Sequence, residues 1–218
     1  MDIDARARCH AALGDPIRLA IVDDLVVGDR SPGSLASRHR LGSNLLAHHL
    51  GVLEEAGLIA RWTSSGDRRR RYVRLRHDVL PDLGFAGTVP AVPVVFICTH
   101  NSARSQLAAA LWAREFGGKV TSAGTHPSDR VHPGAVEAGA RASLDLSGAI
   151  PRDLDGLDLG GAQVITVCDR AHEELEPGPS WWHWSTPDPV DDPDPGSFDL
   201  ALDRLRERIT TLHTEVRP

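Results

Sequence analysis

The sequence contains only three cysteines, and their spacing excludes a disulfide framework. Cys9, Cys98 and Cys168 form an odd and widely separated set, unlike the paired cysteines of small secreted domains. Long apolar runs are missing too, because the longest stretch, Val89–Cys98, is about half of what a membrane span requires and contains prolines. The N-terminus is charged and shows no apolar signal segment. These absences predict a cytoplasmic protein that does not contact a membrane.

Lysine is nearly absent, since Lys119 is the only lysine among 24 Lys and Arg residues. Charge is divided unevenly along the chain. Residues 1–92 carry 13 arginines and 11 acidic residues, a balance of +2, whereas residues 93–218 carry 11 basic and 19 acidic residues, a balance of −8. Only the first part leans towards a polyanionic partner. A length of 218 residues with 41% hydrophobic residues is sufficient for two soluble domains.

Helix signals fill the first 60 residues. Asp15-Pro16 and Ser31-Pro32 each place an N-cap residue before a proline at the first helical position. Ser43 is predicted to cap a third helix, in which Leu46, Leu50 and Leu53 share one buried face. Residues 58–62 and 71–75 then alternate like strands around the turn at 64–67. Three helices followed by a basic hairpin predict an α+β winged helix-turn-helix domain.

Two segments of this region resemble the ArsR/SmtB repressors. Leu13–Leu19 and His48–Ile59 match that family in order and spacing. The resemblance implies a DNA-binding domain, placed at residues 1–77, that forms a homodimer on double-stranded DNA. After Leu75 the chain offers only a short segment, around Val79–Leu83, for the additional dimer helix.

The candidate DNA-contacting residues lie on the third helix and on the hairpin. With the leucines inward, the outward residues are Ser43, Asn44, Ala47, His48 and Gly51. Asn44 and His48 can read base edges, and Ala47 can contact a thymine methyl group. The run Arg68, Arg69, Arg70 and Arg71 suits phosphate contact, although such a run can also be a merely solvated hairpin.

The first domain lacks the usual inducer site of arsenic-responsive repressors. The segment corresponding to their Cys-x-Cys pair is Leu25–Asp29, which contains no cysteine, and Cys9 is the only cysteine in the domain. His39, His48, His49 and His77 share no helical face with carboxylates, so no metal site is predicted, and each is expected to be a surface or groove residue. We therefore expect the second domain to supply the signal, through oxyanion occupancy or the redox state of Cys98.

Residues 78–92 are rich in glycine and proline and are predicted to be a linker. From residue 93 strands and helices alternate, which predicts an α/β domain over 93–218 with a parallel sheet flanked by helices. The expected strands are 94–97, 119–123 and 162–167, and the expected helices are 103–116, 133–142 and 198–212.

The strand at 94–97 leads directly into a Cys-x5-Arg loop that ends at a helix. In such a loop successive backbone N–H groups surround a tetrahedral oxyanion, and the helix N-terminus adds partial positive charge. Arg104 completes the ring with its guanidinium group, and Ser105 can donate to the thiolate of Cys98. This field predicts a lowered pKa and a nucleophilic Cys98. A buried core cysteine is the alternative, but it does not need the polar residues that follow. The predicted oxyanion-binding residues are Thr99, His100, Asn101, Ser102, Ala103, Arg104 and Ser105.

The segment Val95–Gln106 resembles the arsenate reductases that share the low-molecular-weight protein tyrosine phosphatase fold. Supporting segments follow in the expected order: 122–125, 131–136, 164–168, 183–184 and 188–189. The resemblance implies that Cys98 attacks arsenate and that Asp188 protonates the departing oxygen. Gln106 and Val190 stand where the phosphatases have a proline and a tyrosine, which favours reduction over phosphatase activity.

Reduction needs a second thiol and an external thiol reductant, but no bound cofactor. Cys168 is the candidate resolving cysteine by resemblance, and a packed strand-end residue is the alternative. The thioredoxin-linked members carry a further cysteine after it, which this chain lacks. Either Cys168 resolves the adduct and a redoxin reduces the disulfide, or a low-molecular-weight thiol attacks directly. A transcription factor whose second domain is only a sensor, and a tyrosine phosphatase, remain competing hypotheses.

Overall fold

The computed structural model describes residues 1–79 and 83–213, which form two compact units. The first comprises Met1–Ser64, Arg68–Gly87 and Thr211–His213, and the second comprises Ser65–Asp67 and Thr88–Thr210 among the described residues. Residues 80–82, which belong to the predicted linker and to the segment proposed for a dimer helix, lie outside the described residues, as do 214–218. None of the helices in the described ranges combines the length and apolar character that crossing a bilayer requires.

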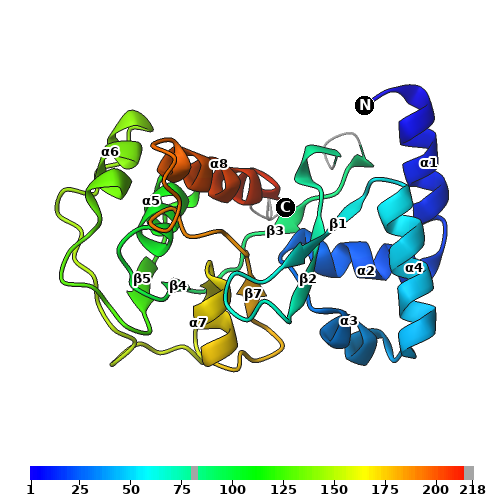
Figure 1. Ribbon diagram of the computed structural model, residues 1–218, viewed down its shortest axis with the longest axis horizontal. Coiled ribbons are helices and arrows are strands. Elements are labelled where there is room, and N and C mark those ends of the chain that lie inside the picture. Colours follow the sequence, from blue (N-terminus) through cyan, green and yellow to red (C-terminus); the bar gives the residue numbers. More distant parts are fainter. Residues whose placement is uncertain (80–82, 214–218) are drawn as a thin grey trace. The chain divides into compact units, whose positions relative to one another are not determined.

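The first unit is built from four helices and an antiparallel hairpin (Figure 1). Asp15 and Ser31 cap two of the helices as predicted, because the Asp15 carboxylate accepts from the amides of Ile17 and Arg18, and the Ser31 hydroxyl accepts from that of Ser34. The elements are α1 (Ile3–Leu13), α2 (Pro16–Val26), α3 (Pro32–His39), α4 (Ser43–Glu55), β1 (Ile59–Thr63), β2 (Arg71–Leu75) and the 3-10 turn η1 (His77–Val79).

Three features of this unit differ from prediction. Helix α1 was not predicted, because no proline or glycine marks its start in the sequence. The prediction that Ser43 caps α4 is wrong, because Gly42 is the N-cap residue and no side chain caps the helix. His49, predicted as a surface residue, is buried, and its Nδ1 lies 3.8 Å from a carboxylate oxygen of Asp15.

The core of the first unit forms where the apolar faces of α2, α3 and α4 meet the hairpin. Leu46, Leu50 and Leu53 are buried, which confirms the predicted inward face of α4. A three-residue turn joins α3 to α4, and Arg40 takes the left-handed conformation within it, at φ 53°. The opposite face of α4 is therefore open to solvent.

The second unit contains a four-stranded parallel sheet of order β5-β4-β6-β7, which confirms the predicted parallel α/β architecture. Helix α5 packs on β4 and β5, and α7 packs on β4 and β6. Figure 1 shows α5, α6 and α8 grouped together, with α7 apart from them. The elements are β4 (Val94–Cys98), α5 (Arg104–Phe116), β5 (Val120–Gly124), α6 (Pro133–Arg141), β6 (Gln163–Thr166), α7 (Asp169–Glu174), β7 (Trp182–His183) and α8 (Ser197–Thr210). The two-residue strands β3 (Gly87–Thr88) and β8 (Leu212–His213), of which Gly87 and Leu212–His213 belong to the first unit, pair with each other.

An aromatic cluster anchors the central strand β4, whose five residues are all buried. The Phe96 ring lies 5.6 Å from Trp112 of α5 and 5.6 Å from Trp184, measured between ring centroids. Aromatic pairs at this separation add to the free energy of burial. Because this cluster fixes β4 and α5, it also fixes both ends of the loop between them.

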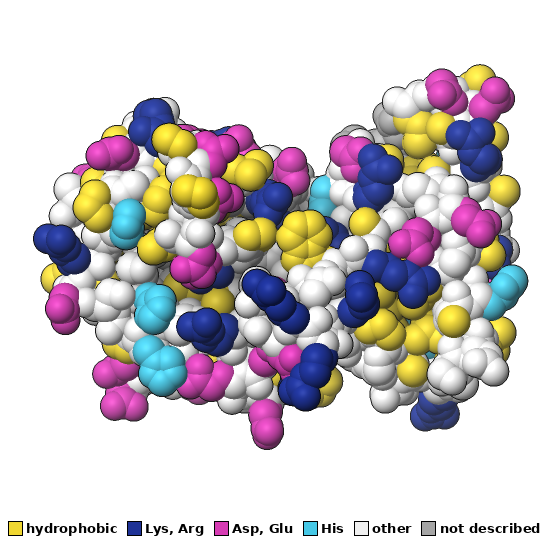
Figure 2. All heavy atoms as spheres, in the orientation of Figure 1, with side chains coloured by type: hydrophobic (Ala, Val, Ile, Leu, Met, Phe, Trp, Pro, Cys, Tyr) yellow, Lys and Arg dark blue, Asp and Glu magenta, His cyan; other side chains and the backbone are white. Residues whose placement is uncertain are grey.

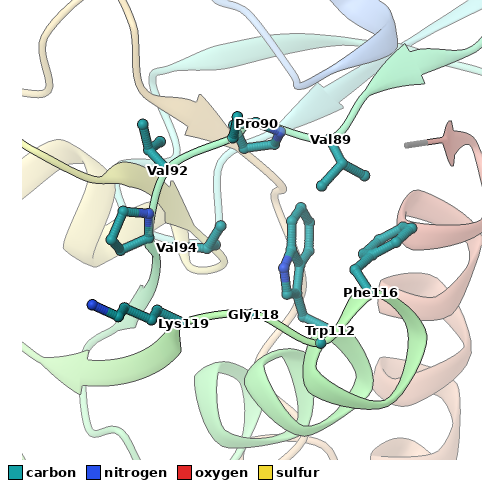
Figure 3. Close-up of a pocket in the computed structure, with 11 residues that line it drawn as sticks. Val89, Pro90, Val92, Val94, Trp112, Phe116, Gly118 and Lys119 are labelled. Atoms are coloured by element: carbon teal, nitrogen blue, oxygen red, sulfur yellow. The ribbon is translucent and has the colours of Figure 1, made fainter. Parts of the chain in front are cut away.

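A small apolar hollow opens at the amino end of β4, at the opposite end of the strand from that loop. It encloses about 300 Å³ and is lined by residues 89–94 together with Trp112 and residues 116–119. Figure 3 shows Trp112 and Phe116 of α5 facing Val89 and Pro90 across it. Lys119 is its only charged lining residue, so the hollow offers packing surface but no catalytic group.

Candidate active site

The loop from Cys98 to Arg104 joins the carboxyl end of β4 to the first turn of α5. Cys98, Asn101 and Arg104 are buried, with exposed fractions of 2%, 0% and 4%. Asn101 has φ 47°, which lets the chain turn back on itself in the middle of the loop. Such backbone conformations occur at sites where the surrounding structure enforces them.

The Cys98 sulfur is held by hydrogen bonds from within the loop. The amide of Asn101 donates to Cys98 Sγ at 3.2 Å, and Ser105 Oγ lies 3.0 Å from the same sulfur. The side-chain amide of Asn101 donates to Ser105 Oγ at 2.8 Å. Because that bond occupies an acceptor site of Ser105, the serine hydroxyl proton is left to point at the sulfur. Asn101 therefore orients Ser105 as a donor to Cys98.

Arg104 connects the loop to the segment that carries Asp188. Its guanidinium donates to the carbonyl oxygen of Thr186 at 3.0 Å and pairs with the Asp188 carboxylate. Burial alone would lower the pKa of Arg104, but Cys168, Cys98 and Asp188 together raise it. The guanidinium is therefore a permanent positive charge inside the site, next to both cysteines.

The predicted lowering of the Cys98 pKa is wrong. Burial raises the pKa of the thiol, and the charge of Cys168 adds to this, whereas Arg104 and the bonds with Ser105 lower it. Removing a thiolate from water costs more than these partners return. Arg104 and Ser105 are thus the groups that limit the cost of forming the thiolate.

Residues outside the Cys-x5-Arg motif brace the loop, and their role was not predicted from the sequence. Gln106 Nε2 donates to both the backbone and side-chain oxygens of Asn101, each at 3.1 Å. The amide of Arg152 donates to Asn101 Oδ1 at 2.9 Å. Gly124 lies opposite Cys98 in the sheet, and a Cβ there would approach Thr99 O to 2.7 Å and Asn101 N to 2.9 Å. Only glycine leaves room for the loop at this position.

Cys168 lies at the same edge of the sheet as Cys98, at the N-cap of α7. It is 2% exposed, and its sulfur lies 3.1 Å from the hydroxyl oxygen of Thr99, the residue that follows Cys98. Cys168 is close enough to Cys98 to contribute to the raised pKa of the Cys98 thiol. The structure thus brings together Cys98, Arg104, Asp188 and Cys168.

The other predicted loop residues have different surroundings. His100 is exposed, and its Nδ1 lies 3.0 Å from the carbonyl oxygen of His126. Ala103 is buried at the N-cap of α5, and Ser102 is half-buried, with its carbonyl accepting from the amide of His132. Each of these contacts fixes the backbone of the loop.

Asp169 and His183 form a buried hydrogen-bonded pair beside Cys168, and neither was predicted as a site residue. His183 Nε2 lies 2.9 Å from Asp169 Oδ1, and both side chains are fully buried. Burial would raise the pKa of Asp169, but the hydrogen bond and charge of His183, with a further bond from Ser185, lower it to about 2. Asp169 is therefore a buried carboxylate.

In the first unit the candidate DNA-contacting residues all reach solvent. Ser43, Asn44, Ala47 and His48 are exposed on α4, and Arg68–Arg71 are exposed at the hairpin. Arg71 also donates to the hydroxyl of Thr63 across the two strands, at 3.2 Å. On the face shown in Figure 2 acidic and basic side chains are interspersed.

Across the described residues, no group of three His, Cys, Asp or Glu side chains is arranged to hold a metal ion.

Comparison with known proteins assigns the second unit. The family model described as low molecular weight phosphotyrosine protein phosphatase matches residues 93–218. The chain belongs to this family.

Known arsenate reductases are similar to the second unit. Arsenate reductase 2 of Staphylococcus saprophyticus is 36% identical over 123 residues, which are 53% of this chain and 88% of that protein. An arsenate reductase of Bacillus cereus is 32% identical over 123 residues, covering 53% of this chain and 90% of its own. A solved arsenate reductase structure from Archaeoglobus fulgidus is 25% identical, covers 53% of this chain and 94% of that one, and has a TM-score of 0.43. Membership places the second unit among enzymes.

Replacing Arg104 by Met, or Ser105 by Ala, should raise the pKa of Cys98 further, because each partner lowers it. A raised thiol pKa means that the thiolate, and hence alkylation, appears only at higher pH. The measurement is the pH dependence of Cys98 alkylation by iodoacetamide, followed by mass spectrometry. Arg114→Met, on the exposed side of α5, is the control. A midpoint for either variant at or below that of the wild type would contradict the assigned roles.

Replacing Asp169 by Asn should destabilise the second unit at neutral pH. The fall of the Asp169 pKa from 3.8 to about 2 corresponds to about 2 kcal/mol of stability. Because the folded-state pKa is lowered, this contribution is present above pH 4 and is lost as the pH falls through about 2. In denaturant unfolding, the free energy of unfolding of the variant should thus be lower than that of the wild type at pH 7, and this difference should shrink as the pH approaches 2. Asp129→Asn, at an exposed position, should leave unfolding nearly unchanged at both pH values.

Proposed function

We propose that the second domain reduces arsenate to arsenite with Cys98 as the nucleophile. The Cys98 thiolate attacks arsenic, and an As–O bond breaks as Asp188 protonates the departing oxygen, which leaves as water. A second thiol then attacks Cys98 Sγ. The S–As bond breaks, and its electron pair passes to arsenic, which leaves as As(III) in arsenite, while the two sulfurs are oxidised to a disulfide.

The arrangement around Cys98 is the observation that carries this proposal. A cysteine at the carboxyl end of a strand, a helix N-terminus behind it and a buried guanidinium six residues later suit a tetrahedral oxyanion such as arsenate or phosphate. Asp188, paired with that guanidinium, lies within reach of an oxygen bound by Arg104. The relatives named arsenate reductase support arsenate as the substrate.

The second thiol comes from Cys168 or from outside the protein. Cys168 is favoured by its position beside Thr99 and by its electrostatic coupling with Cys98 and Arg104. In that case a dithiol redoxin reduces the Cys98–Cys168 disulfide. If Cys168 is not used, a low-molecular-weight thiol attacks the adduct on Cys98 directly. No bound cofactor takes part in either route.

Phosphatase activity is the second candidate, since a phosphate would fit the same loop. Two residues argue against it. Gln106 uses its side-chain amide to hold Asn101, a bond that the proline of the phosphatases cannot make. Val190 is an exposed aliphatic residue where the phosphatases have an aromatic one to hold a phosphotyrosine.

The arsenate reductase proposal predicts arsenate-dependent consumption of thiols and release of arsenite. Cys98→Ser should abolish both, and Asp188→Asn should lower kcat by about 10²- to 10⁴-fold, the usual contribution of a general acid. Cys168→Ser should stop turnover with a redoxin if Cys168 is the resolving thiol. Asp191→Asn, in the same acidic loop, is the matched control. Hydrolysis of p-nitrophenyl phosphate without arsenate-dependent thiol consumption would identify a phosphatase instead. If the protein catalysed neither reaction, the second domain would be a sensor.

We further propose that the first unit is a winged helix-turn-helix domain of the ArsR type that binds DNA as a homodimer. Helix α4 would enter the major groove, with Asn44 and His48 at base edges, and Arg68–Arg71 would contact phosphates. Support comes from the exposed outer face of α4 and from the tight turn that joins it to α3. Within the described residues Cys9 is the only cysteine of this unit, and it is buried, with its sulfur 3.3 Å from the carbonyl oxygen of Ala56.

A buried Cys9 is poorly placed to bind arsenite, so we propose that the signal arises at Cys98, either from a bound oxyanion or from oxidation. The fusion of the two modules and the absence of a Cys-x-Cys pair motivate this hypothesis. Operator affinity measured with arsenate, with arsenite and with an oxidant tests it. An affinity unchanged by all three would refute it.

DNA binding by the first unit should depend steeply on salt, because phosphate contacts release counterions. Replacing Arg68 and Arg70 by Ala should reduce the slope of log K against log salt by about 2, since each phosphate that is no longer neutralised lowers the slope by about 0.9. The assay is fluorescence anisotropy with a labelled duplex of mixed sequence, because this contribution is independent of sequence. The double variant Arg114→Ala, Arg130→Ala in the other unit is the control. Equal slopes for wild type and hairpin variant would exclude the hairpin as a phosphate-binding element.

A further inference from the structure

One imidazole holds the residues on both sides of Cys168. His183 Nδ1 lies 2.9 Å from the hydroxyl oxygen of Thr166, two residues before the cysteine. His183 Nε2 lies 2.9 Å from the carboxylate of Asp169, the residue directly after it. Because Asp169 is ionised, Nε2 must donate to it. The chain segment 166–169 is therefore attached to β7 at two points, with Cys168 between them.

A second histidine reinforces this arrangement. His172, one turn into α7, lies with its Nδ1 2.7 Å from the same Thr166 hydroxyl, and its ring stacks on that of His183 at 3.9 Å between centroids. Helix α7 has only six residues and two of them, Asp169 and Ala171, are buried. Polar contacts, more than apolar packing, thus hold α7 against β6 and β7.

The direction of the Cys168 side chain follows from these contacts. Cys168 has extended backbone angles, φ −150° and ψ 127°, at the point where β6 gives way to α7. Its sulfur lies 3.1 Å from Thr99 on the catalytic loop. Cys168 is the N-cap residue of α7, but its side chain makes no capping hydrogen bond to the helix. Its orientation depends on the anchored neighbours.

We propose that His183 is a positioning residue that holds Cys168 where it can attack Cys98, with Asp169 and Thr166 as the groups through which it acts. The inference deepens the proposed reductase function and rests on it. His183 acts through its contacts with Thr166 and Asp169. Its role is to keep the attacking sulfur in line with its target, and misplacement of about 1 Å can cost about 100-fold in rate.

The step that depends on this placement can be observed without arsenate. Diamide oxidises two thiols to a disulfide and takes up two electrons and two protons. The Cys98–Cys168 disulfide that it produces is detected by mass spectrometry after unreacted thiols are blocked with N-ethylmaleimide. The full chain is used throughout, and alkylation of Cys98 by iodoacetamide is measured in parallel as a readout of the catalytic loop alone.

His183→Ala should slow formation of the disulfide at least about tenfold while leaving the rate of Cys98 alkylation within about twofold of wild type. His183→Gln, whose amide nitrogen can replace Nε2 as the donor to Asp169, should restore part of the rate. His132→Ala is the matched control. His132 stacks on Phe198 and caps α6 in the same unit, so its loss costs stability without affecting Cys168.

Thr166→Val keeps the proposal testable if His183→Ala does not fold, because it removes only the hydroxyl that both histidines contact. It should slow disulfide formation in the same direction as His183→Ala. A wild-type rate in either folded variant, or a loss no larger than that of His132→Ala, would overturn the positioning role. Absence of arsenate-dependent thiol consumption with normal disulfide kinetics would instead refute the reductase function and leave the role of His183 standing.

Discussion

The second unit depends on placing one positive charge, the Arg104 guanidinium, where water cannot reach it. A buried cation is stable only if its neighbours compensate for the lost hydration. Here the compensation comes from three directions: the carbonyl oxygen of Thr186, the carboxylate of Asp188 and the two cysteines. Thr186 and Asp188 lie together on the acidic loop, whereas Cys98 precedes Arg104 on the cysteine loop and Cys168 lies at the start of α7. The charge that suits an oxyanion therefore also holds the acidic loop against the cysteine loop, so binding chemistry and local folding rest on the same interaction.

The general architecture could be predicted from the sequence because its signals are local. The Asp15-Pro16 and Ser31-Pro32 pairs are start signals that act within one turn of helix, and the leucine spacing on α4 defines a face. Apolar strand runs alternating with helices predicted the parallel sheet. These local signals gave wrong predictions where the structure is determined by contacts between residues far apart in the sequence. Ser43 has the right residue type for a cap, yet the chain enters α4 one residue earlier, and His49 looked polar although the packing of α2 against α4 buries it.

The catalytic motif could be predicted in the same way, but the residues outside the motif that hold its loop in place could not. A Cys-x5-Arg spacing is visible in one short segment. Gln106, Arg152 and Gly124 act through contacts with Asn101 or Thr99 that join segments up to 51 residues apart, and no local pattern marks them. The pKa of Cys98 illustrates the same limit. Its donors are readable in the sequence, whereas its degree of burial is a property of the folded unit and outweighs them.

Because the sequence has a single lysine, Lys119 is a unique side-chain site for amine-directed labelling. Lys119 is exposed beside the apolar hollow at the amino end of β4, on the side of the sheet opposite to both thiols of the second unit. Amine-directed reagents consequently meet one lysine side chain in the given sequence, and it lies in the second unit. A fluorophore or a surface linker can thus be attached at Lys119 while both thiols of the second unit stay unmodified.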